Sequence, residues 1–319
     1  MTQPTSRPSP VLSIVVPCFN EEAALPQSVV ALLGALEDLA SKGSISPASS
    51  VYFVDDGSQD RTWPVIVECA AADSRCRGIK LSRNFGHQHA LLSGLLTAPG
   101  DAIISIDADL QDDVSAMKEM VAAYSAGAEV VYGVRAGRQS DSWFKRLTGE
   151  GYYRLARAMS VPLVFNHADY RLLSRRAIDA LAEYRERNLF LRGIIPQLGF
   201  KSALVYYDRR ERVAGVSKYP VRKMLTFALD GITSFSAVPL KLITLLGLVV
   251  SLASFITALW ALWVRIFNPT AVHGWTSTVV PVSLLGGIQL LCTGIIGQYL
   301  AKIYMETKGR PRFNIEKTV

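Results

Sequence analysis

Two long stretches near the C-terminal end of the chain, residues 242–264 and 276–301, contain no charged side chain. A helix needs about 20 apolar residues to cross a hydrocarbon core about 30 Å thick, and each stretch is longer than that. A helix buried in a soluble core is shorter and amphipathic, which disfavours that alternative. We therefore predict a two-helix transmembrane hairpin within residues 238–305.

Basic residues flank this predicted hairpin on both outer sides. They are Arg209, Arg210, Arg212, Lys218, Arg222, Lys223 and Lys241 before it and Lys302, Lys308, Arg310 and Arg312 after it. The connecting residues 265–275 hold a single arginine. By the positive-inside rule, both chain ends of this multi-pass membrane protein are cytoplasmic. Anionic lipid head groups account for the net charge of +7, and nucleic acid is not an expected partner.

The remainder of the chain divides into four segments. Residues 1–10 are polar, lack the apolar core of a signal peptide and are expected to form a disordered tail. Residues 11–217 are expected to form a separate folded domain that stays in the cytoplasm. Residues 218–237 repeat apolar side chains at helical spacing and predict an amphipathic helix in the membrane interface, with packing against the enzyme domain as the alternative. Residues 306–319 form a basic cytoplasmic tail.

Residues 11–217 alternate apolar runs with amphipathic segments. The expected strands are residues 12–16, 51–54, 78–81, 102–106 and 130–134, and the expected helices are residues 23–40, 62–71, 87–96 and 114–126. Because the runs are continuously apolar, they fit strands that are covered on both faces. The pattern predicts a Rossmann-like α/β domain with a mostly parallel sheet.

Polar clusters follow each of the first four expected strands. They occupy residues 17–22, 55–58, 82–86 and 107–109. Any one of them fits ordinary turn chemistry, because Asp, Asn, Ser and Gly are the residues that such turns need. Ligands of parallel sheets bind outside the carboxyl ends of the strands, so four clusters at those ends predict one binding site.

Asp107 and Asp109 lie two residues apart at the end of the fourth strand. In extended backbone their side chains point the same way, and paired carboxylates repel unless a cation joins them. Oxygen ligands suit Mg²⁺ or Mn²⁺, which usually also hold substrate phosphates. Gln111 is a candidate neighbouring ligand. The alternative is that Asp109 only caps the helix that follows.

Asp55 and Asp56 belong to a different strand end, so they are not expected to share that cation. A carboxylate there can accept hydrogen bonds from a base N–H or from ribose hydroxyls, as acidic residues of nucleotide-binding folds do. Turn formation is an equally good explanation for each one. Glu21 begins a helix, where an acidic side chain already gains from the helix dipole.

His87 and His89 form an H-x-H pattern that could suggest zinc. No cysteine or third histidine lies nearby in the sequence, so polar contacts at a helix start are favoured. The four cysteines also lack metal-ligand spacing and are expected to be reduced thiols. Asp169 is a candidate general base, with loop stabilisation as the alternative. The basic residues 209–219 suit either a phosphate group or the lipid surface.

Six short motifs, taken together, resemble those of one known family. They are residues 13–22, 54–58, 82–86, 107–112, 169–172 and 214–219. The chain resembles the inverting nucleotide-sugar glycosyltransferases of family two, which have the GT-A fold. Within that family it is similar to membrane-anchored polyprenyl-phosphate glycosyltransferases, such as dolichol-phosphate mannose synthase and the bacterial bactoprenol glucosyltransferases.

This resemblance implies a role for each matching residue. The nucleotide-binding residues would be Pro17, Phe19, Glu21, Asp55, Asp56 and Asp107. The ligands of Mg²⁺ or Mn²⁺ would be Asp107, Asp109 and Gln111. The catalytic residues would be Asp109 and Asp169, with Asp169 as the proposed base, and the phosphate of the acceptor would be bound by Arg212 and Lys218.

The implied reaction is transfer of a sugar from a nucleotide sugar to undecaprenyl phosphate at the bacterial inner membrane, for glycosylation of the cell envelope. Glucose from UDP-glucose is the first choice, and N-acetylhexosamine, mannose and aminoarabinose stay open. Relatives imply a homo-oligomer. A processive polysaccharide synthase is disfavoured, because such enzymes usually carry a Gln-x-x-Arg-Trp motif. None of the five tryptophans of this chain follows an arginine. The alternative from another class is a non-catalytic nucleotide-sensing membrane scaffold or transporter component, against which the intact pair of Asp107 and Asp109 argues.

Overall fold

The computed structural model describes residues 9–135, 167–208 and 275–319, together with residue 240, residues 243–250 and scattered positions between 252 and 263. The chain forms two compact units. The first contains the described residues up to 208 and residues 310–319, and the second contains those between 240 and 309. The predicted interfacial helix at 218–237 and much of the first predicted span lie outside the described residues.

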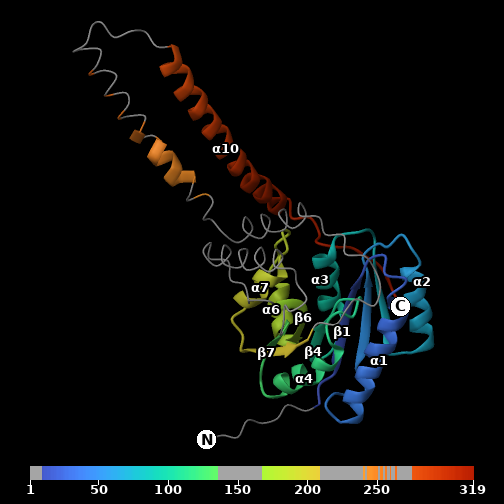
Figure 1. Ribbon diagram of the computed structural model, residues 1–319. Helices are drawn as coiled ribbons and strands as arrows, with labels where there is room; N and C mark the ends of the chain where they lie inside the picture. Colours follow the sequence, from blue (N-terminus) through green and yellow to red (C-terminus); the bar gives the residue numbers. More distant parts are fainter. Residues whose placement is uncertain are drawn as a thin grey trace, which may run out of the picture. The chain divides into compact units, whose positions relative to one another are not determined.

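An eight-stranded mixed sheet forms the centre of the first unit (Figure 1). Its strands are β1 (Leu12–Cys18), β2 (Ser50–Asp55), β3 (Cys76–Leu81), β4 (Ala102–Ser105), β5 (Val130–Arg135), β6 (His167–Ser174), β7 (Ser202–Tyr207) and β8 (Ile315–Thr318). Their order across the sheet is β7-β5-β6-β4-β1-β2-β3-β8. β1, β2, β3 and β4 are parallel, as are β5 and β7, whereas β6 and β8 run antiparallel to their neighbours.

Helices connect and cover these strands. They are α1 (Leu25–Ser41), α2 (Thr62–Ala72), α3 (His87–Thr97), the short 3-10 helix η1 (Val114–Ala116), α4 (Met117–Ser125), α6 (Arg175–Ala182) and α7 (Leu191–Gln197). The five strands and four helices expected up to residue 134 are confirmed, with η1 and α4 together filling the fourth helical range. Of the elements from β6 onward in this unit, none was predicted: β6, α6, α7, β7 and β8.

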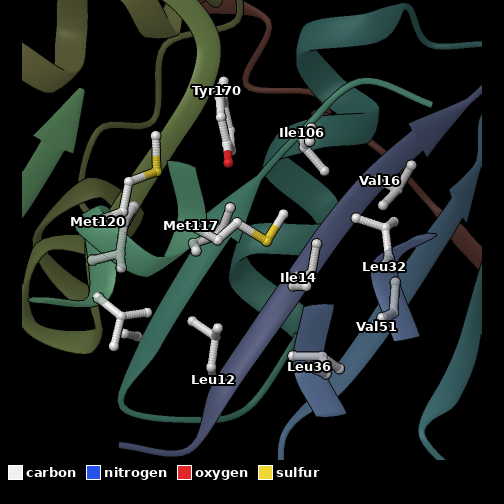
Figure 2. Close-up of a cluster of buried hydrophobic side chains, with 14 of the residues drawn as sticks. Leu12, Ile14, Val16, Leu32, Leu36, Val51, Ile106, Met117, Met120 and Tyr170 are labelled. Atoms are coloured by element: carbon white, nitrogen blue, oxygen red, sulfur yellow. The ribbon is translucent and has the colours of Figure 1, made fainter. Parts of the chain in front are cut away.

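The core of the first unit lies on both faces of β1. One face packs against α1, α4 and neighbouring strands, and Figure 2 shows its side chains Leu12, Ile14, Val16, Leu32, Leu36, Val51, Met117 and Met120. On the other face, a Cβ at Gly94 of α3 would overlap Val15 and Val54, so only glycine allows that close approach. Full burial of one large apolar side chain contributes about 1.5–3 kcal/mol. Coverage on both faces explains why β1 is almost entirely apolar, and its one buried polar side chain, Ser13, donates its hydroxyl to the carbonyl of Pro99.

The last strand of the chain, β8, forms one of the two outer edges of the sheet, beside β3. β8 pairs with β3, and the backbone groups of Gly78 and Val319 exchange hydrogen bonds of 2.8 and 2.9 Å. The N–H of Ser82 donates to the carbonyl of Asn314 at 3.0 Å. The segment predicted as a basic tail therefore contributes a strand that covers the edge of β3.

The second unit contains helix α10 (Trp275–Thr307), which spans the second predicted transmembrane segment. Several side chains of this helix lie outside the described part of the chain. Within the residues that are described, no helix has both the length and the apolar character needed to cross a bilayer. The two-helix hairpin stays a prediction.

Candidate functional site

Strand direction brings the predicted site residues to one edge of the sheet. The carboxyl ends of β1, β2, β3 and β4 meet there because these strands are parallel. β6 is antiparallel to β4, and the pairing of Ser105 with Arg171 brings the amino end of β6, including Asp169, to the same place. β5 runs antiparallel to β6 and parallel to β7, so the carboxyl ends of β5 and β7 also lie at this end of the sheet. This end of the sheet, formed by the ends of the strands and not by an outermost strand, is called the site edge below.

Asp107 and Asp109 lie together in the turn that follows β4. The hydroxyl of Ser28 in α1 donates to the carbonyl of Ala108 at 2.5 Å and holds the turn against the core. The backbone N–H of Gln111 donates to Oδ1 of Asp109 at 3.3 Å. The side chain of Asp107 is 38% exposed, whereas Gln111 is buried.

The helix after this turn is capped by another residue. Asp113 accepts a hydrogen bond from the backbone N–H of Ser115 and precedes η1. The alternative that Asp109 caps the helix is therefore wrong. Asp109 lies four residues before Asp113 and two residues after Asp107.

Acidic side chains crowd around Asp107. Burial raises the pKa of Asp107 to about 6, and the carboxylates of Asp169, Asp112 and Asp109 act in the same direction, while His87 opposes them. A cation would relieve this repulsion. Among the described residues, no group of three or more His, Cys, Asp or Glu side chains is arranged to hold a metal ion. The predicted pair of Asp107 and Asp109 provides only two of the three side chains that such a group needs, so the metal site stays a prediction.

Asp55 and Asp56 are both buried at the end of β2, yet their contacts differ. Asp56 accepts the backbone N–H groups of Phe85 at 2.7 Å and Gly86 at 2.9 Å, one on each oxygen. Burial raises the pKa of Asp56, against these two hydrogen bonds. Asp55 accepts the N–H of Ser58 on Oδ1 at 3.0 Å, and its buried Oδ2 has no hydrogen-bond partner within the described residues. Asp56 thus holds the loop before α3, whereas the nucleotide contact of Asp55 stays a prediction.

Gly57 allows this loop to pack against the end of β2. Its φ is 67°, and a Cβ would lie 2.5 Å from the carbonyl carbon of Arg83 and 2.6 Å from the nitrogen of Asn84. Gly57→Ala should lower the free energy of unfolding by about 1–3 kcal/mol, because backbone strain and a backbone clash coincide. Thermal unfolding of the full chain in detergent measures the loss.

Gly43→Ala is the matched control, since Gly43 has the same φ and open space around its Cβ position. It should cost only the left-handed backbone penalty, about 1–2 kcal/mol. Equal losses in the two variants would show that the clash with the 83–84 backbone is relieved at no cost.

The three nucleotide contacts predicted at the end of β1 differ in exposure: Pro17 is buried, Glu21 is partly exposed and Phe19 is exposed. Pro17 is buried inside β1, opposite Val54. The backbone N–H of Glu21 donates to Oγ1 of Thr62 at 2.8 Å, which ties the loop to the start of α2. Phe19 is 44% exposed and can offer its ring to a ligand.

Asp169 lies at the centre of an ion network. Nε and Nη2 of Arg192 donate to its two oxygens at 3.2 and 3.0 Å, and Nη2 of the buried Arg171 donates to Oδ1. Nε2 of His87 and Nε2 of Gln88 each lie 3.5 Å from Oδ2. Burial opposes ionisation, but Arg192, His87 and Arg171 hold the pKa of Asp169 well below its usual range.

A carboxylate with such a low pKa is a weak base. The role of Asp169 as catalytic base stays a prediction, and its saturated hydrogen bonding favours a role in positioning instead. Gln88 supports this arrangement, because its Oε1 accepts the backbone N–H of Leu191 at 3.1 Å and so links the starts of α3 and α7.

His87 lies between two carboxylates. Its Nε2 is 3.6 Å from Oδ1 of Asp107 and 3.5 Å from Oδ2 of Asp169. Burial alone would lower the pKa of His87, but the hydrogen bond to Asp169 and the charge of Asp107 raise it. His87 therefore makes the polar contacts that were predicted at the start of this helix.

Two parts of the site edge were not found from the sequence. The first is Arg192, which comes to Asp169 from a separate helix and belongs to no recognised motif. The second is Asp112, whose Oδ1 accepts hydrogen bonds from Nε and Nη2 of Arg135 at 3.1 and 2.9 Å and from the hydroxyl of Tyr207 at 2.6 Å. Asp112 belongs to the motif at residues 107–112, and that was its only sequence signal. The predicted acceptor-binding residues Arg212 and Lys218 lie outside the described residues.

Comparisons with known proteins bear on this site. The family model described as glycosyl transferase family 2 matches residues 13–182. An uncharacterized glycosyltransferase of Bacillus subtilis, YkoT, is 47% identical over 309 residues, which are 96% of this chain and 91% of the relative. A prophage bactoprenol glucosyl transferase homolog of Escherichia coli is 39% identical over 307 residues, which are 96% of this chain and 98% of the relative.

Among solved structures, glucosyl-3-phosphoglycerate synthase from Mycobacterium tuberculosis is similar with a TM-score of 0.45 and 17% sequence identity. The match covers 70% of this chain and 78% of the synthase. A similarity of this size assigns no ligand and no residue role.

Proposed function

Because this chain belongs to glycosyltransferase family 2, we propose that it transfers a sugar from a nucleotide sugar to a polyprenyl phosphate, with inversion at the anomeric carbon. The observation that carries the proposal is the 39% identity, over nearly the full length of both chains, to a bactoprenol glucosyl transferase homolog. Glucose from UDP-glucose is accordingly the first donor to test. N-acetylhexosamine, mannose and aminoarabinose donors are the alternatives.

The donor would occupy the site edge from β2 to β4. The unpartnered Oδ2 of Asp55 is an acceptor for a base N–H or a ribose hydroxyl, and pairing it would recover the cost of about 1–3 kcal/mol that an unsatisfied buried group carries. The exposed ring of Phe19 can pack against the base. Asp107 and Asp109 would hold Mg²⁺ or Mn²⁺, because such ions use one or two carboxylates together with substrate phosphates.

The proposed reaction is a displacement at the sugar carbon C1. An oxygen of the acceptor phosphate attacks C1, the bond from C1 to the donor diphosphate breaks, and the nucleoside diphosphate leaves. When bound, the divalent ion supplies positive charge for the leaving diphosphate. The acceptor phosphate is already ionised at neutral pH, so the protein's main task is to align the two substrates.

Membrane attachment is part of the proposal, since the acceptor is a lipid. The support comes from the two uncharged stretches of the sequence and from exposed apolar side chains of α10, namely Val282, Leu285, Leu290, Ile296, Leu300 and Ile303. Basic residues on the outer sides of both stretches support a cytoplasmic catalytic domain at a bacterial inner membrane. A homo-oligomer is proposed only from the resemblance.

The test is a transfer assay with the full chain purified in detergent. The protein is incubated with undecaprenyl phosphate, Mg²⁺ or Mn²⁺ and each of several radiolabelled nucleotide sugars, and the lipid phase is then extracted. We expect label in the lipid from one donor and none after addition of a chelator. Folded protein that labels no lipid with any donor would instead favour a non-catalytic nucleotide-sensing scaffold or another acceptor.

A further inference from the structure

The turn that follows β4 contains a backbone conformation that ordinary side chains rarely adopt. Leu110 lies between the two predicted ligands Asp109 and Gln111 and has a φ of 49°. Apart from Asn20, it is the only residue other than glycine with a positive φ in the described part of the chain. The left-handed conformation costs free energy, and leucine, unlike asparagine, has no polar side chain with which to offset that cost locally. The surrounding structure must therefore hold the turn in this shape.

The side chain of Asp112 ties the end of this turn to two strands. It is 1% exposed, and its Oδ1 accepts hydrogen bonds from Nε and Nη2 of Arg135, at the end of β5, at 3.1 and 2.9 Å. The hydroxyl of Tyr207, at the end of β7, donates to the same oxygen at 2.6 Å. The ring of Tyr207 packs edge-on against that of Tyr170 in β6, with the ring centroids 5.3 Å apart. Because hydrogen bonds to a carboxylate are stronger than neutral ones, these three bonds can offset the backbone cost at Leu110.

The other side of the strained residue is held as well. The hydroxyl of Ser28 in α1 donates to the carbonyl of Ala108 at 2.5 Å, two residues before Leu110, and Asp112 lies two residues after it. The turn is thus fixed on both sides of Leu110. A site that is ordered in advance loses less entropy when its ligand binds.

The buried carboxylate of Asp112 has no part in the proposed reaction itself. We propose that Asp112 is a positioning residue, which holds the turn 107–112 in its left-handed form and so fixes where the carboxylates of Asp107 and Asp109 lie. This inference rests on the proposed function, in which these two carboxylates receive the divalent ion and the diphosphate of the donor.

The experiment compares Asp112→Asn and Tyr207→Phe in the full chain in detergent. Asp112→Asn keeps the shape of the side chain without its charge, and Tyr207→Phe removes one hydrogen bond while its ring can still pack on Tyr170. For each variant, kcat and the KM values of the nucleotide sugar and of undecaprenyl phosphate are measured. Equilibrium dialysis with radiolabelled UDP, and with GDP in parallel, measures nucleotide binding at several Mn²⁺ concentrations.

Asp112→Asn should raise the donor KM and weaken Mn²⁺-dependent nucleotide binding about 10- to 100-fold, the range of a lost hydrogen bond to a charged group. Tyr207→Phe should have an effect of about 10-fold, at the low end of that range. Both variants should change the KM of undecaprenyl phosphate less than about twofold, below the effect of one such hydrogen bond. Tyr207→Phe carries the test if Asp112→Asn does not fold.

A second substitution separates positioning from general stability. Leu110→Asn places in the turn a residue that adopts the left-handed conformation more readily. If the bonds of Asp112 hold that conformation, Tyr207→Phe should weaken nucleotide binding less than about threefold in the Leu110→Asn background, since residues that share a task are not additive. Effects that simply multiply in the double variant would overturn the inference.

Asp73→Asn is the matched control. Nε and Nη2 of Arg75 donate to Asp73 at 2.7 to 3.2 Å, the same fork as in the pair of Arg135 and Asp112. This pair precedes the amino end of β3 and so lies away from the site edge. Asp73→Asn should leave the donor KM and nucleotide binding unchanged. Loss of Mn²⁺-dependent binding in Asp112→Asn with no effect of Tyr207→Phe would make Asp112 a metal ligand and would overturn the positioning role.

The dialysis measurement keeps this inference distinct from the proposed function. Weaker nucleotide binding in Tyr207→Phe, rescued by Leu110→Asn, supports the inference even if the chain labels no lipid. Lipid labelling together with nucleotide binding that Asp112→Asn leaves unchanged would overturn the inference and leave the proposed function intact. An unsubstituted chain that binds neither UDP nor GDP at any Mn²⁺ concentration would also overturn it, because the turn would then have no diphosphate to receive.

Discussion

Asp109→Ala is expected to lower kcat/KM by a factor on the order of 10²–10³. The carboxylate lies two residues from Asp107 in the turn after β4, where burial, together with the acidic neighbours, raises the pKa of Asp107 to about 6. In the proposed function, Asp107 and Asp109 hold a cation that is worth several kcal/mol to the leaving diphosphate. Removing one of these two carboxylates would weaken that hold, and each 1.36 kcal/mol is a factor of ten in rate. The measurement is the initial rate of lipid labelling, with Mn²⁺ titrated for each variant.

Asp113→Ser is the matched control for this prediction. Asp113 lies in the same loop but caps η1 through the N–H of Ser115, and serine can keep that cap. Its activity should stay within about threefold of the unsubstituted enzyme, less than the effect of one charged hydrogen bond. If Asp109→Ala retains full activity and reaches half of its maximal rate at the same Mn²⁺ concentration as the unsubstituted enzyme, the metal assignment at this turn is wrong.

Asp169→Ala should lower the free energy of unfolding by about 3–5 kcal/mol, the usual cost of leaving a buried charge without its partner. The charge left behind is that of Arg171, which is 1% exposed and whose Nε and Nη1 have no hydrogen-bond partner among the described residues. Thermal or denaturant unfolding of the full chain in detergent measures this loss.

Adding Arg171→Met to Asp169→Ala should restore part of the stability, because an apolar side chain of similar length removes the uncompensated charge. A double variant no more stable than Asp169→Ala would mean that the loss comes from Arg192 or from packing.

The conservative Asp169→Asn should also cost less rate than Asp109→Ala, since a carboxylate with a strongly lowered pKa contributes little as a base. Equal losses of rate would defeat that ranking.

Local sequence determined the first half of the fold and the content of its turns. Continuous apolar runs specify strands that are covered on both faces, as Ile14, Val15 and Val16 are, and Gly57 specifies a turn that no other residue fits as well. The pair of Asp107 and Asp109 was recognisable because two residues that lie two apart stay close in any fold, and in extended backbone their side chains point to the same side.

The tertiary structure decided how distant residues combine. Asp55 and Asp56 are adjacent residues of the same type, and the sequence does not distinguish them. In the structure the loop before α3 donates hydrogen bonds to both oxygens of Asp56, whereas one oxygen of Asp55 has no partner among the described residues. The antiparallel course of β6 brings Asp169 beside Asp107, and the link through Gln88 brings Arg192 to it. The C-terminal residues become β8 because the edge of β3 offers unpaired backbone groups. Each of these pairings joins segments far apart in the chain, and a local pattern of apolar and polar residues carries no record of which strand or helix lies next to which.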